Sequence, residues 1–175
     1  MNADKTEKHI KSAVISAHQR HQRSIWRLQT LNELHESTLF YEAGSYKHSN
    51  LTKQIIGIFY AVYNALGYGF LEKVYENAMV IRLRKAGFTV SQQQPIKVYF
   101  DGQVVGEYFA DLVVNGLVIL EIKAVKELTE AHEAQLINYL KATPYEVGLL
   151  LNFGPKPQIV RKAYDNRRKS LLKEQ

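Results

Sequence analysis

The chain has 175 residues, carries a formal net charge of +6 and contains no cysteine. This length suits one domain with a substantial core, and the lack of cysteine excludes a disulfide framework and a thiolate zinc site. The sequence has no secretory signal and no apolar run near the roughly 20 residues of a membrane-spanning helix, so we expect a cytoplasmic protein without a membrane partner.

The first 48 residues differ in composition from the rest, because they hold five of the six histidines: His9, His18, His21, His35 and His48. Their apolar residues have a loose helical spacing that His21 interrupts, so residues 1–50 are predicted to be an N-terminal arm, either helical or partly disordered. His18 and His21 have a spacing that suits a metal, but with no third ligand type nearby we favour a solvated helix. The arm is also a candidate contact for a homo-oligomer or a protein partner.

Two helices are predicted next, over residues 52–66 and about 70–86, each ended by a glycine. In the first helix the apolar face consists of Ile55, Phe59, Val62 and Leu66. In the second, helical spacing predicts a core face made of Leu71, Val74, Ala78 and Ile81. Glu72, Tyr75 and Met79 then lie to another side of that helix.

Three strands follow, over about 95–100, 104–113 and 117–124, with Asp101-Gly102 and Asn115-Gly116 as their turns. Thr129 can cap a helix that extends to about residue 142, where Thr143-Pro144 closes it. The apolar run 146–153 predicts a strand buried on both faces. The order ααβββαβ is that of an α/β domain with a crossover between its last two strands.

Residues 156–175 are strongly basic, with a net charge of +5. We predict that they form a C-terminal extension, which is either a phosphate-binding patch or a solvated end. In the first case the candidate contacts to nucleic acid are Arg161, Lys162, Arg167, Arg168 and Lys169.

Three charged residues, Asp111, Glu121 and Lys123, interrupt the apolar hairpin over residues 110–125. Charges in the core of a sheet are costly unless they are paired or hold a metal. Glu121 and Lys123 share one face of their strand. Asp111 joins them if the turn is a three-residue loop, 114–116, with Gly116 left-handed and Asp111 paired with Ile119. A two-residue loop would turn Asp111 to the other face, and we predict the three-residue loop.

Two converging carboxylates repel each other and are driven towards protonation unless a cation lies between them. Hard oxygen ligands with no Cys or His nearby favour Mg²⁺ or Mn²⁺. Lys123 would then stand where it can orient a water and stabilise charge on an attacked phosphate. The alternative is an ordinary salt bridge between Lys123 and one acid, with the other acid solvated.

The spacing of Asp111, Glu121 and Lys123, on a hairpin that precedes a helix and a buried strand, resembles the PD-(D/E)XK nuclease superfamily. One departure is Ala110, which stands where the superfamily name has proline. The next helix carries Gln135 and Tyr139, which match the QxxxY element of several branches.

The segment "GFLEKVY" (69–75) resembles, more specifically, the motif of the GxxExxY family within that superfamily, through Gly69, Glu72 and Tyr75. The resemblance covers about residues 51–155. It implies a restriction-endonuclease-like αβββαβ core, with a mixed central sheet flanked by helices.

The resemblance also implies Mg²⁺-dependent phosphodiester hydrolysis of DNA or RNA by a metal-activated water, with Mn²⁺ as a substitute ion. Asp111, Glu121 and the backbone carbonyl of Ile122 would hold the metal, with Glu72 as an additional acid and Lys123 serving the water. Gln135 and Tyr139 would contact the substrate phosphate or orient Lys123 and Glu121, although Tyr139 can also simply pack on the sheet. His132 is interpreted as a structural residue at the start of its helix.

A second function is open, because a fold does not dictate an activity. The chain could be a catalytically silent nuclease-fold module that binds nucleic acid or serves in an assembly. The complete set of Asp111, Glu121 and Lys123 favours the nuclease.

Overall fold

The computed structural model describes residues 46–169. Its helices are α2 (Ser49–Leu66), α3 (Glu72–Lys85) and α4 (Glu130–Ala142), and a short 3-10 turn, η1, covers Asn166–Arg168. None of the described helices is both long and apolar enough to cross a lipid bilayer. Most of the predicted N-terminal arm, including His18 and His21, lies outside the described residues.

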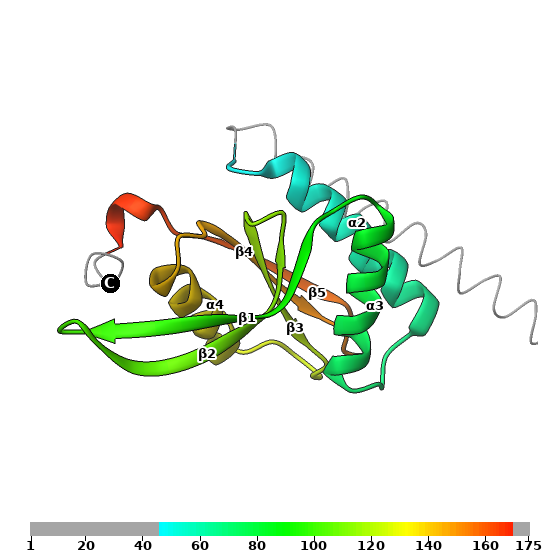
Figure 1. Ribbon diagram of the computed structural model, residues 1–175. Coiled ribbons are helices and arrows are strands. Elements are labelled where there is room, and N and C mark those ends of the chain that lie inside the picture. Colours follow the sequence, from blue (N-terminus) through cyan, green and yellow to red (C-terminus); the bar gives the residue numbers. More distant parts are fainter. Residues whose placement is uncertain (1–45, 170–175) are drawn as a thin grey trace, which may run out of the picture. The chain divides into compact units, whose positions relative to one another are not determined.

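The strands are β1 (Val90–Phe100), β2 (Gln103–Val114), β3 (Val118–Lys123), β4 (Val147–Asn152) and β5 (Gln158–Ala163). Within the described residues they form one sheet in the order β1-β2-β3-β4-β5 (Figure 1). The β3–β4 pair is parallel and is connected by α4, whereas the other neighbouring strands are antiparallel. The predicted α/β class, the mixed central sheet and the order of the elements as far as β4 are therefore confirmed.

The fifth strand was not predicted, because residues 156–175 were expected to be an extension of the domain. Gln158–Ala163 instead pairs antiparallel with β4 at the edge of the sheet. The segment QIVRKA is short and carries two basic residues, which is typical of an edge strand but hides its strand character in the sequence. The ordered sheet consequently continues to Ala163.

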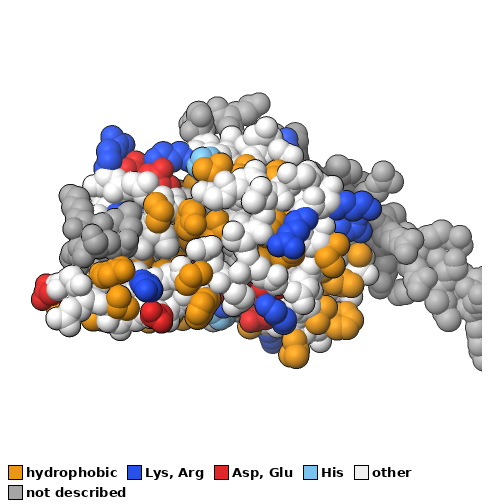
Figure 2. Space-filling model, in the orientation of Figure 1, with side chains coloured by type: hydrophobic (Ala, Val, Ile, Leu, Met, Phe, Trp, Pro, Cys, Tyr) orange, Lys and Arg blue, Asp and Glu red, His pale blue; other side chains and the backbone are white. Residues whose placement is uncertain are grey.

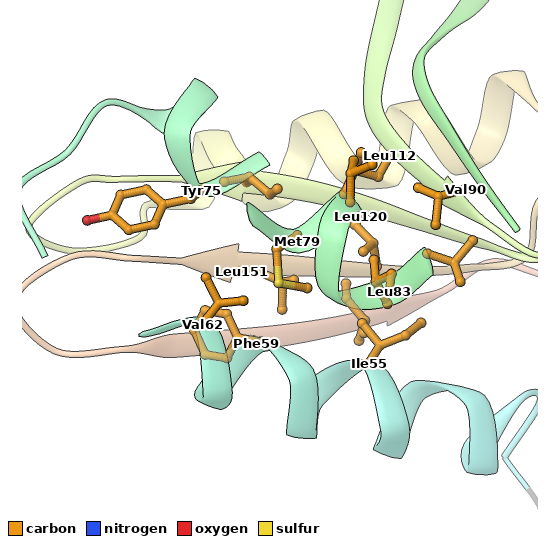
Figure 3. Packing of buried hydrophobic residues seen from close by; sticks show 14 of the residues in the cluster. Ile55, Phe59, Val62, Tyr75, Met79, Leu83, Val90, Leu112, Leu120 and Leu151 are labelled. Atoms are coloured by element: carbon orange, nitrogen blue, oxygen red, sulfur yellow. The ribbon is translucent and has the colours of Figure 1, made fainter. Parts of the chain in front are cut away.

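Helices α2 and α3 lie on one face of the sheet and α4 lies on the other (Figure 1). The core beneath α2 and α3 contains Ile55, Phe59 and Val62 from α2, as predicted (Figure 3). Leu66, the fourth residue of the predicted face, is exposed at the end of the helix. Burying each of these side chains contributes about 1.5–3 kcal/mol before the entropy cost of ordering the chain. This apolar layer holds the central strands in place behind the charged residues.

The predicted core face of α3 is wrong. The helix buries Tyr75, Met79 and Leu83, which are four residues apart, whereas Val74 and Ile81 are exposed. The Tyr75 ring stacks on Phe153 at a centroid distance of 4.3 Å, and its hydroxyl donates to the Gly67 carbonyl at 2.9 Å. The face with Tyr75 is buried because an aromatic ring buries more apolar surface than a valine, and its hydroxyl can find a hydrogen-bond partner. Leu71, at the N-terminal boundary of the helix, is exposed as well.

Candidate active site

The turn between β2 and β3 sets the position of Asp111. Asn115 and Gly116 are both left-handed, with φ of 53° and 64°, and the Leu117 N–H donates to the Val114 carbonyl at 3.0 Å. The ladder then pairs Val113 with Ile119. The loop thus comprises residues 115–117, and the predicted pairing of Asp111 with Ile119 is wrong by two positions.

A common face of Asp111 and Glu121 does not follow from the alternation of the strand, because Ala110 and Val113 of β2 are both buried in the cluster beneath α4 and the alternation breaks between them. Asp111 nevertheless lies beside the other two charges, since its carboxylate raises the pKa of both Glu121 and Lys123. The ladder stops at Leu112 and Leu120, and beyond it Oδ2 of Asp111 accepts a hydrogen bond from the Ile122 N–H at 2.8 Å.

Glu121 is the most buried charged residue of the site, with an exposed fraction of 3%. Its Oε1 accepts from the Lys123 ammonium at 2.8 Å. Its other oxygen, Oε2, is buried and has no hydrogen-bond partner among the described residues. A buried carboxylate oxygen without a donor is costly, so this atom is poised for a cation or a proton.

The electrostatics agree with that geometry. Burial, followed by the charge of Asp111, raises the pKa of Glu121 to about 7, against the opposing effect of Lys123. Burial also raises the pKa of Asp111, although the hydrogen bond from Ile122 lowers it. Burial lowers the pKa of Lys123, but the hydrogen bond to Glu121 and the negative charges around the ammonium together outweigh this effect and leave the pKa raised. At neutral pH the ammonium is charged, and Glu121 is close to its titration point.

Helix α4 places Gln135 and Tyr139 one turn apart beside the two acids. Nε2 of Gln135 donates to the Tyr139 hydroxyl at 2.8 Å. Burial raises the pKa of the Tyr139 phenol, the Gln135 bond lowers it, and the charge of Glu121 raises it further. The structure thus brings this pair close to the charged hairpin. His132 lies at the helix start, where its Nδ1 accepts from the Thr129 N–H at 3.1 Å, so it caps the helix as expected.

Glu72 reaches the site from the other side of the sheet, at the first position of α3. Its Oε1 accepts from the Ala124 N–H at 3.2 Å, directly after the end of β3. Its negative charge raises the pKa of both Glu121 and Lys123. Glu72 therefore lies close to the charged residues of the hairpin, although the core face of its helix differs from the predicted one.

A buried acid that sequence reasoning missed lies behind Asp111. Glu76 accepts hydrogen bonds at its Oε1 from Lys73 at 2.8 Å, Gln92 at 2.7 Å and Gln93 at 3.1 Å. Nε2 of Gln93 is also 3.4 Å from Oδ1 of Asp111. Gln93 therefore bridges two carboxylates, and its backbone is left-handed, with φ of 52°.

Two signals in the sequence could have revealed this network. Glu76 lies one helical turn after Glu72, so both acids face the same way, and residues 92–94 are three consecutive glutamines at the start of a strand. A positive φ in a non-glycine residue within a strand is a strained conformation that clusters at functional sites. Only the fold shows that Gln93 adopts it.

The predicted nucleic-acid contacts lie at the end of the sheet and beyond it. Nη2 of Arg161 donates to the Lys47 carbonyl at 2.7 Å, and Lys162 forms an ion pair with Glu133 on α4. Arg167 hydrogen-bonds Asp165, with its Nε 3.1 Å from Oδ1. Arg168 is exposed and lies over the ring of Tyr164. Their contact with nucleic acid stays a prediction.

Lys169 was predicted to contact nucleic acid, but its side chain is buried instead of facing solvent. Its ammonium donates to the carbonyls of Thr143 at 2.7 Å and Tyr145 at 2.6 Å. Burial lowers its pKa to about 8. The side chain therefore fastens the end of the domain to the loop after α4 and is not offered to a phosphate.

The donor set at the hairpin fits a hard divalent cation. The described residues contain no group of three or more His, Cys, Asp or Glu side chains arranged to hold a metal ion. Asp111 and Glu121 supply two carboxylates, one with an unpartnered buried oxygen, and their pKa values are raised as expected for acids that need a counter-charge. Mg²⁺ commonly uses one or two carboxylates and keeps several waters, so two acids are sufficient.

One of the comparisons with known proteins identifies a superfamily. The family model described as the PD-(D/E)XK nuclease superfamily matches residues 49–162. Among solved structures, the crystal structure of SSO0001 aligns with 73% of this chain at 19% identity and a TM-score of 0.45. The aligned part is 66% of that chain, so this chain spans slightly less than two thirds of its length. No curated protein matches significantly.

Proposed function

Because the chain belongs to the PD-(D/E)XK nuclease superfamily, we propose that it hydrolyses phosphodiester bonds of nucleic acid with Mg²⁺, for which Mn²⁺ can substitute. The superfamily match covers well over half of the chain and includes the whole charged hairpin. The observation that carries the proposal is the buried, unpartnered Oε2 of Glu121, beside Lys123 and close enough to Asp111 for the charge of that acid to raise the pKa of Glu121.

Asp111, Glu121 and the carbonyl of Ile122 are the proposed metal ligands, with Glu72 as a further acid at the edge of the site. A divalent cation, when bound, supplies the positive charge that neutralises a phosphate and makes a nearby water more acidic. The hydrogen bond from the Ile122 N–H holds the Asp111 carboxylate and orients it. The raised pKa of Glu121 means that this side chain must lose its proton before it can serve as a ligand.

Lys123 is proposed to hold the attacking water and to stabilise the negative charge that develops on the phosphate. Its pKa is raised, so its ammonium keeps its proton at neutral pH and acts as a donor. The Tyr139 hydroxyl, fixed by Gln135 at 2.8 Å, is proposed to donate to a phosphate oxygen. Both donors are in place before substrate binds, which lowers the cost of orienting the reacting groups.

Within the superfamily, we propose that the chain is a member of the GxxExxY family. Each of the three motif residues has a local role that supports the assignment. Gly69 has φ of 109°, which side chains rarely adopt, Glu72 contacts the end of β3, and Tyr75 closes the loop before α3 through Gly67. The acid of the proposed motif, Glu72, thus lies beside the end of β3, close to Glu121 and Lys123.

The test is cleavage of a plasmid and of a single-stranded oligonucleotide with Mn²⁺, Mg²⁺ or EDTA. Lys123→Met and Glu121→Gln are expected to lose about 100- to 10,000-fold in rate, since they remove a positioned donor and a metal ligand. Lys97 and Glu107 form a matched control pair on the exposed hairpin, 3.9 Å apart, and Lys97→Met and Glu107→Gln should cleave like the wild type. Equal cleavage by wild type and Lys123→Met would contradict the assigned role.

The alternative function is a silent nuclease-fold module that binds nucleic acid without cleaving it. The direct ion pair between Lys123 and Glu121 favours this alternative, because it already occupies one of the carboxylate oxygens. Salt-dependent binding that is insensitive to metal, together with no cleavage under any of the conditions above, would identify the chain as such a module.

A further inference from the structure

The β1–β2 hairpin carries an exposed aromatic side chain next to the proposed active site. This hairpin extends from the sheet past α4 (Figure 1), and hydrophobic side chains lie among charged ones on its surface (Figure 2). Tyr108 on β2 pairs with Ile96 on β1. Ile96 and Ala110 are both buried in the cluster beneath α4, so at this level the even-numbered positions of β2 face that helix. The Tyr108 side chain is nevertheless 50% exposed.

The ring of Tyr108 is next to the ring of Tyr139, which in turn lies near Asp111 and Glu121. Its centroid lies 6.0 Å from that of Tyr139, with an angle of 47° between the ring planes. Tyr139 lies near Glu121 and Asp111, because the negative charges of both acids raise its pKa. A group that stacks on Tyr108 would therefore be adjacent to a phosphate bound at Asp111 and Glu121.

The ring of Tyr108 packs against its own strand. A Cβ added at Gly106 would lie only 3.1 Å from Cε2 of Tyr108, so the ring occupies the space that a side chain at this position would need. Tyr139 borders the ring as well. An aromatic ring packed in this way, with half of its surface exposed, can stack on a planar ligand and loses less rotamer freedom than a ring without such contacts.

We propose that Tyr108 is a stacking platform for an unpaired base of the substrate, so that the protein prefers single-stranded or locally unpaired nucleic acid. The inference rests on the proposed function for the class of substrate. Stacking on an aromatic side chain requires a free face of the base, which a base within a continuous duplex does not offer. Tyr108 thereby favours single-stranded over double-stranded nucleic acid and positions the phosphate next to the stacked base over Asp111 and Glu121.

The test measures binding by the full chain in EDTA, where no metal supports cleavage. The probe is a single-stranded oligonucleotide that contains 2-aminopurine, whose fluorescence changes on stacking, compared with a duplex of the same sequence. Tyr108→Phe keeps the ring, and Tyr108→Leu keeps an apolar side chain without a π face. Phe109→Leu is the matched control, since Phe109 is 54% exposed and, as the next residue of the strand, points to the other face of the hairpin.

We expect the wild type and Tyr108→Phe to bind the single strand more tightly than the duplex. Tyr108→Leu should lose about 5- to 100-fold in affinity for the single strand and the fluorescence change with it, while its duplex affinity stays the same. Phe109→Leu should behave like the wild type. Equal single-strand affinity in Tyr108→Leu and wild type, or an equal loss in Phe109→Leu, would overturn the inference.

The outcome can be separated from that of the proposed hydrolysis. If the wild type binds through Tyr108 but does not cleave with Mn²⁺, the hydrolysis proposal fails and the stacking platform stands. If wild type and Tyr108→Leu cleave single strand and duplex with the same ratio of rates, the platform is refuted while the nuclease assignment stands. Tyr108→Phe guards against a folding defect, because it removes only a half-exposed hydroxyl.

Discussion

Two lysine–glutamate pairs lie on the same sheet in opposite environments. Lys123 and Glu121 are 2.8 Å apart, with side chains only 13% and 4% exposed, whereas Lys97 and Glu107 are 3.9 Å apart and 54% and 63% exposed. An exposed pair in water is worth little, but a buried pair is strongly coupled to its surroundings. The comparison shows that burial, together with the nearby Asp111, leaves one of the two glutamates with a raised pKa and an unpartnered carboxylate oxygen. The proposed chemical role is therefore confined to the buried pair.

The largest expected effect is on cleavage. Glu121→Gln should reduce the rate by about 1,000-fold, because the amide is a poor ligand for a hard cation and Lys123 loses its partner. Glu107→Gln should change the rate by less than about twofold. Steady-state rates with Mn²⁺ measure both variants, and a similar loss in the two would remove the distinction between the pairs.

The next effect is on stability. In EDTA at pH 8, Lys123→Met should lower the free energy of unfolding by about 2–4 kcal/mol, because it leaves the Glu121 carboxylate buried without its counter-charge. At pH 5 the loss should shrink to less than about 1 kcal/mol, since Glu121 is then protonated. Lys97→Met should cost less than about 0.5 kcal/mol at either pH. Denaturant unfolding at the two pH values decides whether the loss follows the charge of Glu121.

The pH dependence of stability follows from the raised pKa of Glu121. Its pKa is about 7 in the folded chain and 4.5 as the reference value, so between these values the folded state binds more protons than the unfolded state. The stabilising contribution is complete below about pH 4.5 and is lost as the pH rises through about 7. Without metal, wild type should lose about 2–3 kcal/mol over this range relative to Glu121→Gln. Parallel stability curves for the two proteins would contradict this account.

The smallest effect concerns the bridge between Glu76 and Asp111. Gln93→Gly removes the amide but tolerates the left-handed backbone, and Asp101→Gly is a matched control at another left-handed residue, with φ of 49°. Because the Gln93 bond lowers the pKa of Asp111, its loss should raise that pKa and shift the acid limb of the pH–rate profile upwards. We expect about a two- to fivefold loss in rate below neutral pH, and no shift in Asp101→Gly. An unchanged profile in Gln93→Gly would exclude this role.

The sequence predicted the elements of the core better than their exact pairing. Asp111 lies beside Glu121 as predicted although its predicted pairing partner was wrong, and the break in alternation between Ala110 and Val113 could not be seen in the sequence. The core face of α3 was wrong because two apolar stripes compete on that helix, and only packing against Phe153 chooses the one with Tyr75. The edge strand β5 was missed because charged residues conceal it.

Some residues of the candidate site could likewise be predicted from the sequence, and others could not. Asp111, Glu121 and Lys123 were found from spacing, since the acids and the lysine interrupt an apolar hairpin where charges are costly. Glu76 and Gln93 were not found, because their connection depends on a strained backbone angle and on contacts between a helix and a strand. Burial of Lys169 was equally invisible, because it arises from where the last turn folds back onto the loop after α4.

The most direct test of the account is a calorimetric titration with Mn²⁺ at pH 6 and pH 8, because the central claim is that Asp111 and Glu121 together hold one hard cation. We predict one bound ion per chain, with proton release at pH 6 as Glu121 gives up its proton, and at least tenfold weaker binding in Asp111→Asn but not in Glu107→Gln. Binding of equal strength in wild type and Asp111→Asn, or no binding at either pH, would contradict the claim.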